Sequence, residues 1–390
     1  MASIYEPARL TISAAAAGDS NGGCFILKEL LTPVQLPNGS TNVYIEKHHP
    51  DGSRFSKHLC LINSALSSNP LQTHGWTLQE TLLSRRLLIF GAGRLSWRCA
   101  EASITHENGI HWMPRGLDKN TFRVGPNFKA LLEYPEATEL MQHVPASNLW
   151  YTMMEEYSKR KLTYLSDRIP ALVGLITAYR QRIGDTPLAG LWQKDLHYGL
   201  LWRRASSATT KPRELASIPS WSWLSMDAHV EWPETGLEDG LELKAKILDA
   251  SLDWTGAELV SSIARGTLLI SGALYKVIVK PNDSLLGDGV NICDIWPSDK
   301  RTGQRQMRNT VTKPIGACVL DGELPATQIW CLQTCTRGLG GFSYGEWVDD
   351  VLLLLLTGLE PYQYQRIGVG QIDVESGTFH GISNVQVTLV

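Results

Sequence analysis

The chain has 390 residues, a formal net charge of −3 at pH 7 and a pI near 6.4, so it lacks the basic excess through which proteins bind nucleic acids or anionic membranes. Hydrophobic residues make up 43%, and the longest apolar run, residues 351–356, is far shorter than the ~20 residues that span a bilayer. Seven irregularly spaced cysteines predict reduced thiols. We therefore expect a cytoplasmic protein without a nucleic-acid partner or a membrane span.

The first half of the chain carries helical and strand patterns in turn. Residues 73–83 predict a short helix, and residues 86–97 predict two strands around a glycine turn. Apolar residues at helical spacing predict a helix over 149–162. Ser166 is expected to cap a further helix that ends at Gly184, and a third helix is predicted over residues 188–203.

Beyond residue 240 the helical periodicity fades. Short β-rich runs alternate with glycine and proline, and residues 299–314 predict a polar, basic loop. We therefore predict an α+β fold in two parts. Residues 1–240 would contain a helical, tryptophan-rich middle, and residues 241–390 would form a β-rich region packed on it.

The most distinctive block is Pro219-Ser220-Trp221-Ser222-Trp223. Two tryptophans two residues apart would place both indoles on one side of an extended segment. The chain holds 13 tryptophans, and nine of them lie between Trp76 and Trp232. Such a density predicts either a structural core or the wall of an apolar pocket.

Further blocks accompany this pentapeptide in a fixed order, at residues 74–80, 82–90, 95–99, 157–164, 166–171, 190–192 and 200–202, with a thinner late block at 364–368. Together these blocks resemble the later half of heterokaryon-incompatibility (HET) domain proteins, a family typical of filamentous fungi. The resemblance covers most of the chain. It implies a remnant of an α/β HET domain and a role in fungal non-self recognition and cell death.

Two blocks that usually open a HET domain, of the types Ser-Tyr-x-Trp-Gly and Cys-Ile-Asn-Gln, do not occur in the sequence. The segment that begins at Met1 resembles a point deep inside the domain. We therefore expect the N-terminal half of the domain to be absent, either in reality or because translation starts further upstream. An intact killing activity is then not expected from these residues alone. His74 also departs from the family, which usually has arginine there.

Motifs for metals and cofactors are weak. His106 and His111 lie five residues apart around Gly109, which misses the i, i+4 spacing of a zinc pair on a helix. The glycine-rich segments 338–341 and 368–370 lack the setting of a nucleotide-binding loop and are interpreted as turns. No Gly-x-Ser-x-Gly nucleophile motif occurs. The sequence therefore predicts neither a metal nor another cofactor.

Three side chains are candidates for catalysis: His74, Glu80 and Arg168. A buried Arg168 or Glu80 could polarise a ligand carbonyl, and His74 titrates near neutrality. Each has a structural alternative. Arg168 beside Asp167 can form a helix cap and an ion pair, and His74 can be an ordinary surface or core histidine.

Six tryptophans are candidates for the wall of a substrate pocket, with core packing as their alternative: Trp76, Trp97, Trp192, Trp202, Trp221 and Trp223. A pocket that holds an apolar substrate in a reactive conformation, with one hydrogen bond to a carbonyl, needs no cofactor. The sequence thus favours a cofactor-independent cyclase or pericyclase, of Diels–Alder type, in fungal specialised metabolism. The alternative is a truncated or regulatory heterokaryon-incompatibility protein, with another incompatibility protein as its partner.

Overall fold

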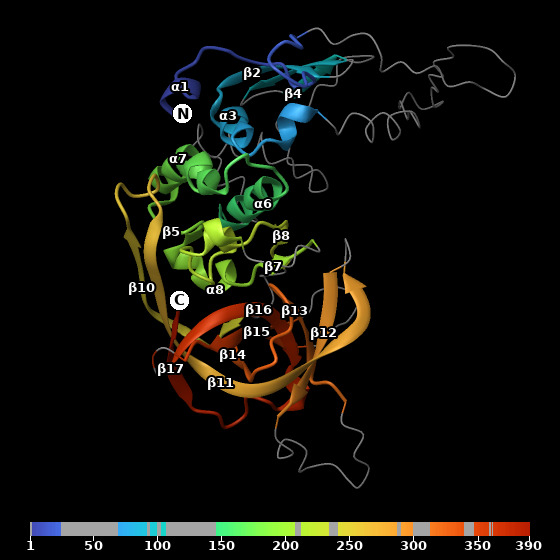
Figure 1. Ribbon diagram of the computed structural model, residues 1–390, viewed down its shortest axis with the longest axis vertical. Coiled ribbons are helices and arrows are strands. Elements are labelled where there is room, and N and C mark those ends of the chain that lie inside the picture. The colour runs from blue at the N-terminus through green and yellow to red at the C-terminus, as the bar shows by residue number, and fades with distance from the viewer. Residues whose placement is uncertain are drawn as a thin grey trace, which may run out of the picture. The chain divides into compact units, whose positions relative to one another are not determined.

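The fold of the chain is seen in a computed structural model, which describes residues 2–24, 69–91, 94–99, 103–106, 146–206, 212–233, 241–286, 290–298, 313–338, 347–358, 360 and 362–390 (Figure 1). It combines helices with a large β-rich C-terminal region, so the α+β class is confirmed. The chain forms two compact units. One holds residues 1–142 and 160–162, and the other holds 143–159 and 163–390. The tryptophan-rich middle and the C-terminal strands share one unit, so the two units do not divide at the predicted boundary near residue 240.

The first unit contains a four-stranded sheet in the order β1-β2-β3-β4. β1 runs parallel to β2, and the remaining pairs are antiparallel. Its elements are α1 (Ala2–Tyr5), β1 (Thr11–Ser13), η1 (Pro70–Thr73), α3 (Thr77–Leu83), β2 (Arg86–Gly91), β3 (Arg94–Cys99) and β4 (Ser103–His106). The two strands predicted over residues 86–97 are confirmed. The helix predicted over residues 73–83 is shorter, because a 3-10 turn precedes it.

Helices of the second unit begin with α6 (Ala146–Ser158), η2 (Leu165–Arg168), η3 (Pro170–Leu172) and α7 (Val173–Ile183). Gly184 ends α7 in the left-handed region at φ 61°, as predicted. The predicted cap at Ser166 is wrong. Ser166 lies inside η2, and none of η2, η3 and α7 has a side-chain cap.

The helix predicted over residues 188–203 is also wrong. This segment forms a two-residue hairpin between β5 (Pro187–Leu188) and β6 (Leu191–Trp192), followed by η4 (Gln193–Asp195), α8 (Leu196–Gly199) and β7 (Arg203–Arg204). The physical reason is the turn itself, because Ala189 and Gly190 have φ values of 47° and 84°. Two successive positive φ angles form the tight turn of a hairpin and interrupt a helix.

The tryptophan pentapeptide is not extended either. It leads into η6 (Trp223–Ser225), which Ser222 caps by accepting a hydrogen bond from the Leu224 N–H at 3.1 Å. Nearby elements are η5 (Arg213–Leu215) and β8 (Val230–Glu231), and β8 pairs with β7. The prediction that this segment is an extended strand with both indoles on one side is therefore wrong, because the segment leads into a 3-10 turn.

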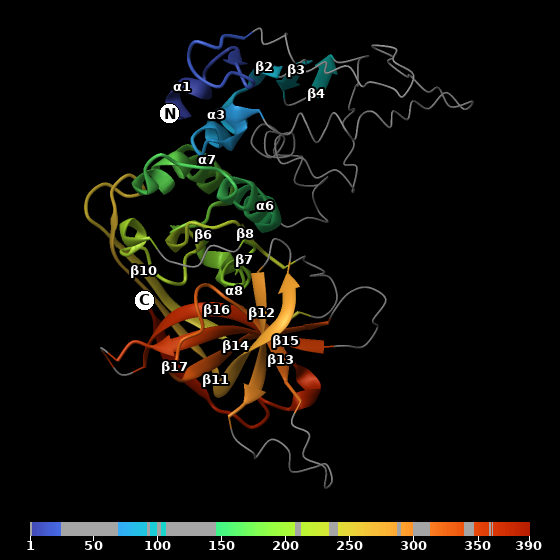
Figure 2. The same cartoon turned by 45° about the vertical axis from the view of Figure 1, so that its right-hand side comes forward.

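The C-terminal region closes into a six-stranded antiparallel barrel in the order β11-β12-β13-β16-β15-β14, with β14 pairing back to β11. Closure leaves these strands without a free edge. The barrel strands are β11 (Ile263–Leu286), β12 (Val290–Pro297), β13 (Gly316–Leu320), β14 (Ile329–Gly338), β15 (Trp347–Leu356) and β16 (Gln363–Asp373). Figure 2 shows α6, α7 and α8 on one side of this barrel, as Figure 1 does.

Three further strands extend this sheet. β9 (Glu242–Leu243) pairs with β14, whereas β10 (Lys246–Trp254) and β17 (Asn384–Leu389) pair with the first part of β11. A short turn, η8 (Val374–Ser376), follows β16. The hairpin of β10 and β11 reaches α7, where Arg180 and Glu258 form an ion pair of 3.6 Å. The predicted loop at residues 299–314 lies mostly outside the described residues.

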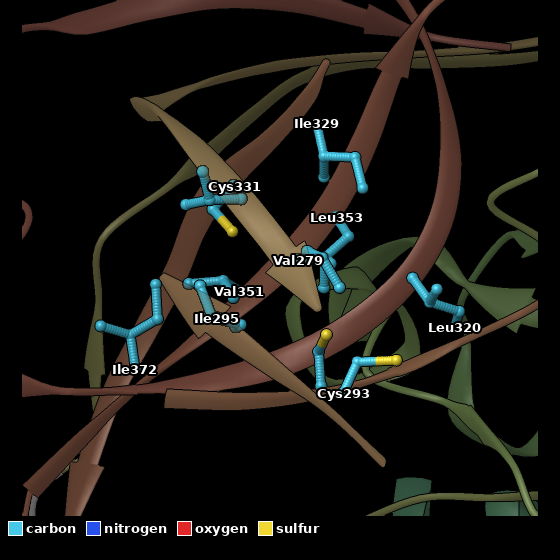
Figure 3. Close-up of a cluster of buried hydrophobic side chains, with 11 residues drawn as sticks. Val279, Cys293, Ile295, Leu320, Ile329, Cys331, Val351, Leu353 and Ile372 are labelled. Atoms are coloured by element: carbon cyan, nitrogen blue, oxygen red, sulfur yellow. The ribbon is translucent and has the colours of Figure 1, made fainter. Parts of the chain in front are cut away.

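A compact apolar cluster fills the barrel (Figure 3). Its buried members are Val277, Val279, Cys293, Ile295, Cys318, Leu320, Ile329, Cys331, Val351, Leu353 and Ile372. β15 explains the apolar run of the sequence, because Val351 and Leu353 belong to this cluster while Leu352 and Leu354 are buried on the opposite face. The sequence of a strand that is buried on both faces is hydrophobic at successive positions rather than at alternate ones.

The glycines of residues 368–370 serve barrel packing. A Cβ at Gly370 would lie 2.7 Å from the Cys318 Cβ and 3.0 Å from the Ile295 Cδ1. The first distance is too short for a further carbon and the second is tight, so β16 approaches its neighbour closely because it has no side chain at this position. The segment lies within β16, which excludes the turn that the sequence predicts there.

Three of the barrel thiols give a first testable expectation. Cys293, Cys318 and Cys331 are free and buried, and burial raises the pKa of each thiol. Because the thiolate is the reactive form, we expect these cysteines to resist an aromatic disulfide reagent in the native protein and to react fully in guanidinium. Peptide mapping after labelling measures this for each cysteine. Rapid native labelling of Cys331 would contradict the buried assignment.

Candidate functional site

Two of the tryptophan blocks, those at residues 190–192 and 219–223, meet at the Ala189-Gly190 turn. The Gly190 carbonyl accepts hydrogen bonds from two indole N–H groups, those of Trp150 at 3.0 Å and Trp223 at 3.1 Å. The Ser222 hydroxyl donates to the Ala189 carbonyl at 2.6 Å. The blocks at 190–192 and 219–223 are therefore two halves of one buried contact.

Glycine is required at this turn for two separate reasons. The backbone of Gly190 has φ 84°, which residues with a side chain rarely adopt. A Cβ at this position would also lie 2.7 Å from the Trp223 Nε1 and 2.9 Å from the Leu224 Cδ1. The turn and the indole that it anchors are thus packed against each other without space for a methyl group.

Other indoles are anchored in the same way. The Trp202 N–H donates to the Trp221 carbonyl and the Trp232 N–H to the Gly199 carbonyl, both at 3.0 Å. Trp150 and Trp192 pack edge to face with ring centroids 5.1 Å apart. This is the geometry that aromatic pairs prefer in protein cores.

Four predicted substrate-binding residues, Trp192, Trp202, Trp221 and Trp223, are only 0–1% exposed. They are core residues of the second unit, so the structure supports the core alternative for them. Trp76 and Trp97 lie in the first unit and are half-buried.

The first unit also holds two of the predicted catalytic residues. His74 is exposed, and its carbonyl accepts hydrogen bonds from the Thr77 hydroxyl at 2.8 Å and from Arg160 Nη1 at 3.3 Å. Glu80 is half-buried beside Tyr5. Burial raises the pKa of Glu80, and a hydrogen bond from Tyr5 opposes that rise.

Arg168 is the third predicted catalytic residue, and it lies in the second unit. Its side chain is 3% exposed, and Nη1 lies 3.5 Å from Oδ1 of Asp227. The guanidinium carbon lies over the Trp223 ring at 5.4 Å, and the Arg168 carbonyl accepts a hydrogen bond from the Tyr157 hydroxyl at 2.8 Å. Burial lowers the pKa of Arg168, and Tyr157 and Asp227 oppose this effect. No single unit holds all three catalytic candidates.

A second buried arginine was not singled out by the sequence. Arg366, in the late block on β16, lies with its guanidinium carbon 3.4 Å from the centroid of the Trp202 ring. Its Nη2 donates to the Trp202 carbonyl, and its Nη1 lies 3.4 Å from Oδ2 of Asp321. Burial lowers the pKa of Arg366 to about 10 and raises that of Asp321 to about 6, although Arg366 and Arg204 lower the latter.

Arg168 and Arg366 make the same kind of contact, because each lies over the ring of a tryptophan from another motif block. Arg168 of the block at 166–171 lies over Trp223, and Arg366 of the block at 364–368 lies over Trp202. Each therefore places a cation on an indole face, an arrangement that is favourable for a desolvated arginine. Sequence spacing alone could not pair residues that lie so far apart in the chain.

No family model matches this chain, and neither a curated protein nor a solved structure matches it. The resemblance to HET proteins therefore stays a prediction that rests on the motif blocks. Among the described residues, no three His, Cys, Asp or Glu side chains gather as they would around a metal ion, and no helix is long and apolar enough to cross a membrane. The side chains of His106 and His111 lie outside the described part of the chain.

Proposed function

We propose that this chain is a recognition or regulatory protein of the HET type, which acts by binding a partner incompatibility protein rather than by catalysis at its tryptophans. The observation that carries this proposal is the anchoring of four buried indoles, two of which, Trp202 and Trp223, lie in the motif blocks. Trp150, Trp202, Trp223 and Trp232 each donate their N–H to a main-chain carbonyl inside the second unit.

Indoles that wall a substrate pocket must leave one face open to the ligand. Trp202, Trp221 and Trp223 are each 0% exposed, and their neighbours are protein groups rather than open surface. Removal of such a ring typically costs ~3–5 kcal/mol of folding free energy. These residues therefore support a rigid scaffold, and recognition would fall to the outer surface of the unit.

The cyclase hypothesis requires an open apolar site beside a polar donor. The buried Arg168 could supply the donor, but four of the six proposed wall residues are packed in the core. Cyclase activity is therefore kept as the competing outcome of the experiment below.

The test is co-expression in a filamentous fungus with a complete HET-domain protein whose expression arrests growth. We expect this chain to change the degree of arrest, in either direction, and to leave the extracted metabolites unchanged. The matched control is the Gly190→Ala variant, in which the anchoring turn is disrupted. Its co-expression should leave the growth arrest caused by the HET-domain protein unchanged. If the native chain leaves the degree of arrest unchanged, the proposal is contradicted. If a newly cyclised metabolite also accumulates, the result favours the cyclase.

A further inference from the structure

The side chain of Arg168 presents unused hydrogen-bond donors beneath the surface. Its Nη1 lies 3.5 Å from the Asp227 carboxylate, within ion-pair distance. Within the described part of the chain, Nε and Nη2 are buried and have no hydrogen-bond partner. Buried polar groups are nearly always paired, so two orphan donors on one cation need a physical explanation.

The surroundings of Arg168 do not satisfy these donors. A cation over an indole interacts with it through the flat face of the ring, which leaves the in-plane N–H groups available. The indole N–H of Trp223 is itself used, since it donates to the Gly190 carbonyl. Tyr157 donates its hydroxyl to the Arg168 carbonyl rather than accepting from the guanidinium.

Nε and Nη2 belong to the same edge of a guanidinium, and their N–H bonds run nearly parallel. This fork matches the two oxygens of a carboxylate or phosphate group and binds it through two hydrogen bonds. A lysine at the same place would keep the charge and lose the fork. The pair of unused donors therefore has the geometry of a site for an oxyanion.

We propose that the Nε–Nη2 edge of Arg168 binds the carboxylate or phosphate group of a small ligand. This inference goes beyond the proposed recognition function and does not depend on it. The ligand would approach beside Asp227, whose side chain is 52% exposed, whereas that of Arg168 is 3% exposed. Because Asp227 is negatively charged, it opposes an incoming anion and competes for Arg168.

This competition sets the design of the test. Loss of the Asp227 charge should strengthen anion binding, whereas loss of the Arg168 fork should weaken it. Asp227→Asn changes an exposed side chain, so the variant is expected to fold. Arg168→Lys keeps the positive charge at a buried position. Arg180→Lys is the matched control, because Arg180 lies in the same unit, is exposed and pairs with Glu258.

The measurement is the thermal midpoint at pH 7.5 during titration with inorganic phosphate or with acetate, at an ionic strength held constant with sodium chloride. We expect a saturable rise in the midpoint of the native protein with at least one of these anions. The apparent Kd should be at least about tenfold weaker in Arg168→Lys, severalfold tighter in Asp227→Asn and unchanged in Arg180→Lys. Comparison of the two titrations identifies which oxyanion the fork prefers.

Three results would overturn the proposal. One is the absence of a saturable shift with either anion in both the native protein and Asp227→Asn. Another is an equal shift in Arg168→Lys and the native protein, which would place the anion elsewhere. If Arg168→Lys does not fold, Asp227→Asn decides, since binding no tighter than in the native protein refutes the competition on which the site depends.

Discussion

Replacement of Gly190 by alanine is expected to destabilise the second unit by about 3–5 kcal/mol. The backbone of Gly190 has φ 84°, and a side chain in the left-handed region costs about 1–2 kcal/mol. The added Cβ would lie 2.7 Å from the Trp223 Nε1, so the indole must move, and overpacking of this kind costs about 1–3 kcal/mol. Movement of the turn also weakens the two indole hydrogen bonds that the Gly190 carbonyl accepts.

Urea unfolding followed by tryptophan fluorescence measures this loss. Gly184→Ala is the matched control, because Gly184 also has a positive φ of 61° but has no atom within 4 Å of its virtual Cβ. It should lose only the backbone contribution, about 1–2 kcal/mol. Equal losses in the two variants would show that the contact with Trp223 contributes nothing, and the anchoring role of the turn would then be wrong.

The same turn shows where sequence reasoning reached its limit. Residues 188–203 have apolar spacing that suits a helix, and Ala189 is itself a strong helix former. The hairpin forms in place of a helix because the buried Gly190 carbonyl accepts hydrogen bonds from two indoles, one in α6 and one in η6. This stabilisation arises only when distant segments of the chain meet. A local pattern contains no information on such a partner.

Features set by local chemistry were predicted well. Gly184 ends α7 because a left-handed residue closes the last helical turn, and the strands β2 and β3 follow from two short runs on either side of a glycine turn. The apolar run at 351–356 also forms a strand, β15. What the run could not reveal is that both of its faces are buried, with Val351 and Leu353 in the barrel interior and Leu352 and Leu354 on the opposite face.

For the candidate site residues too, the sequence indicated local features but not the partners that the tertiary structure brings together. The sequence identified Arg168 as a special arginine because it follows an aspartate in a motif block, but its ion-pair partner Asp227 is 59 positions away in the chain. Arg366 lies in the late motif block at 364–368, but nothing in the sequence paired it with Asp321 or indicated that either charge is buried. A buried ion pair depends on desolvation, which only the tertiary structure determines.

Replacement of Arg366 by methionine is expected to destabilise the protein by about 3–5 kcal/mol at pH 7.5. Methionine retains the apolar contact with the Trp202 ring but removes the cation that faces Asp321. The buried carboxylate then keeps only the influence of Arg204, and the Trp202 carbonyl loses its donor. The double variant Arg366→Met/Asp321→Asn should recover most of this loss, since it leaves no buried carboxylate behind.

The effect of pH provides a second and independent signature of this ion pair. Burial raises the pKa of Asp321 in the folded protein to about 6, above the ~3.9 of an unfolded chain. The folded state therefore holds an extra proton between about pH 4 and 6, and the stability that this proton provides is present below pH 4 and lost as the pH rises through 6. A difference of about two units corresponds to about 3 kcal/mol.

Comparison of the native protein with Asp321→Asn isolates this contribution, because all other groups titrate in both. Between pH 4.5 and 7.5 the native protein should lose stability relative to Asp321→Asn. The penalty of Arg366→Met should grow over the same interval, because at low pH Asp321 is protonated and no ion pair remains to be broken. If urea midpoints show the same loss of stability for Arg366→Met at pH 5 and pH 7.5, the charge of Asp321 does not determine that loss. The Arg366 cation would then contribute only through its contacts with Trp202.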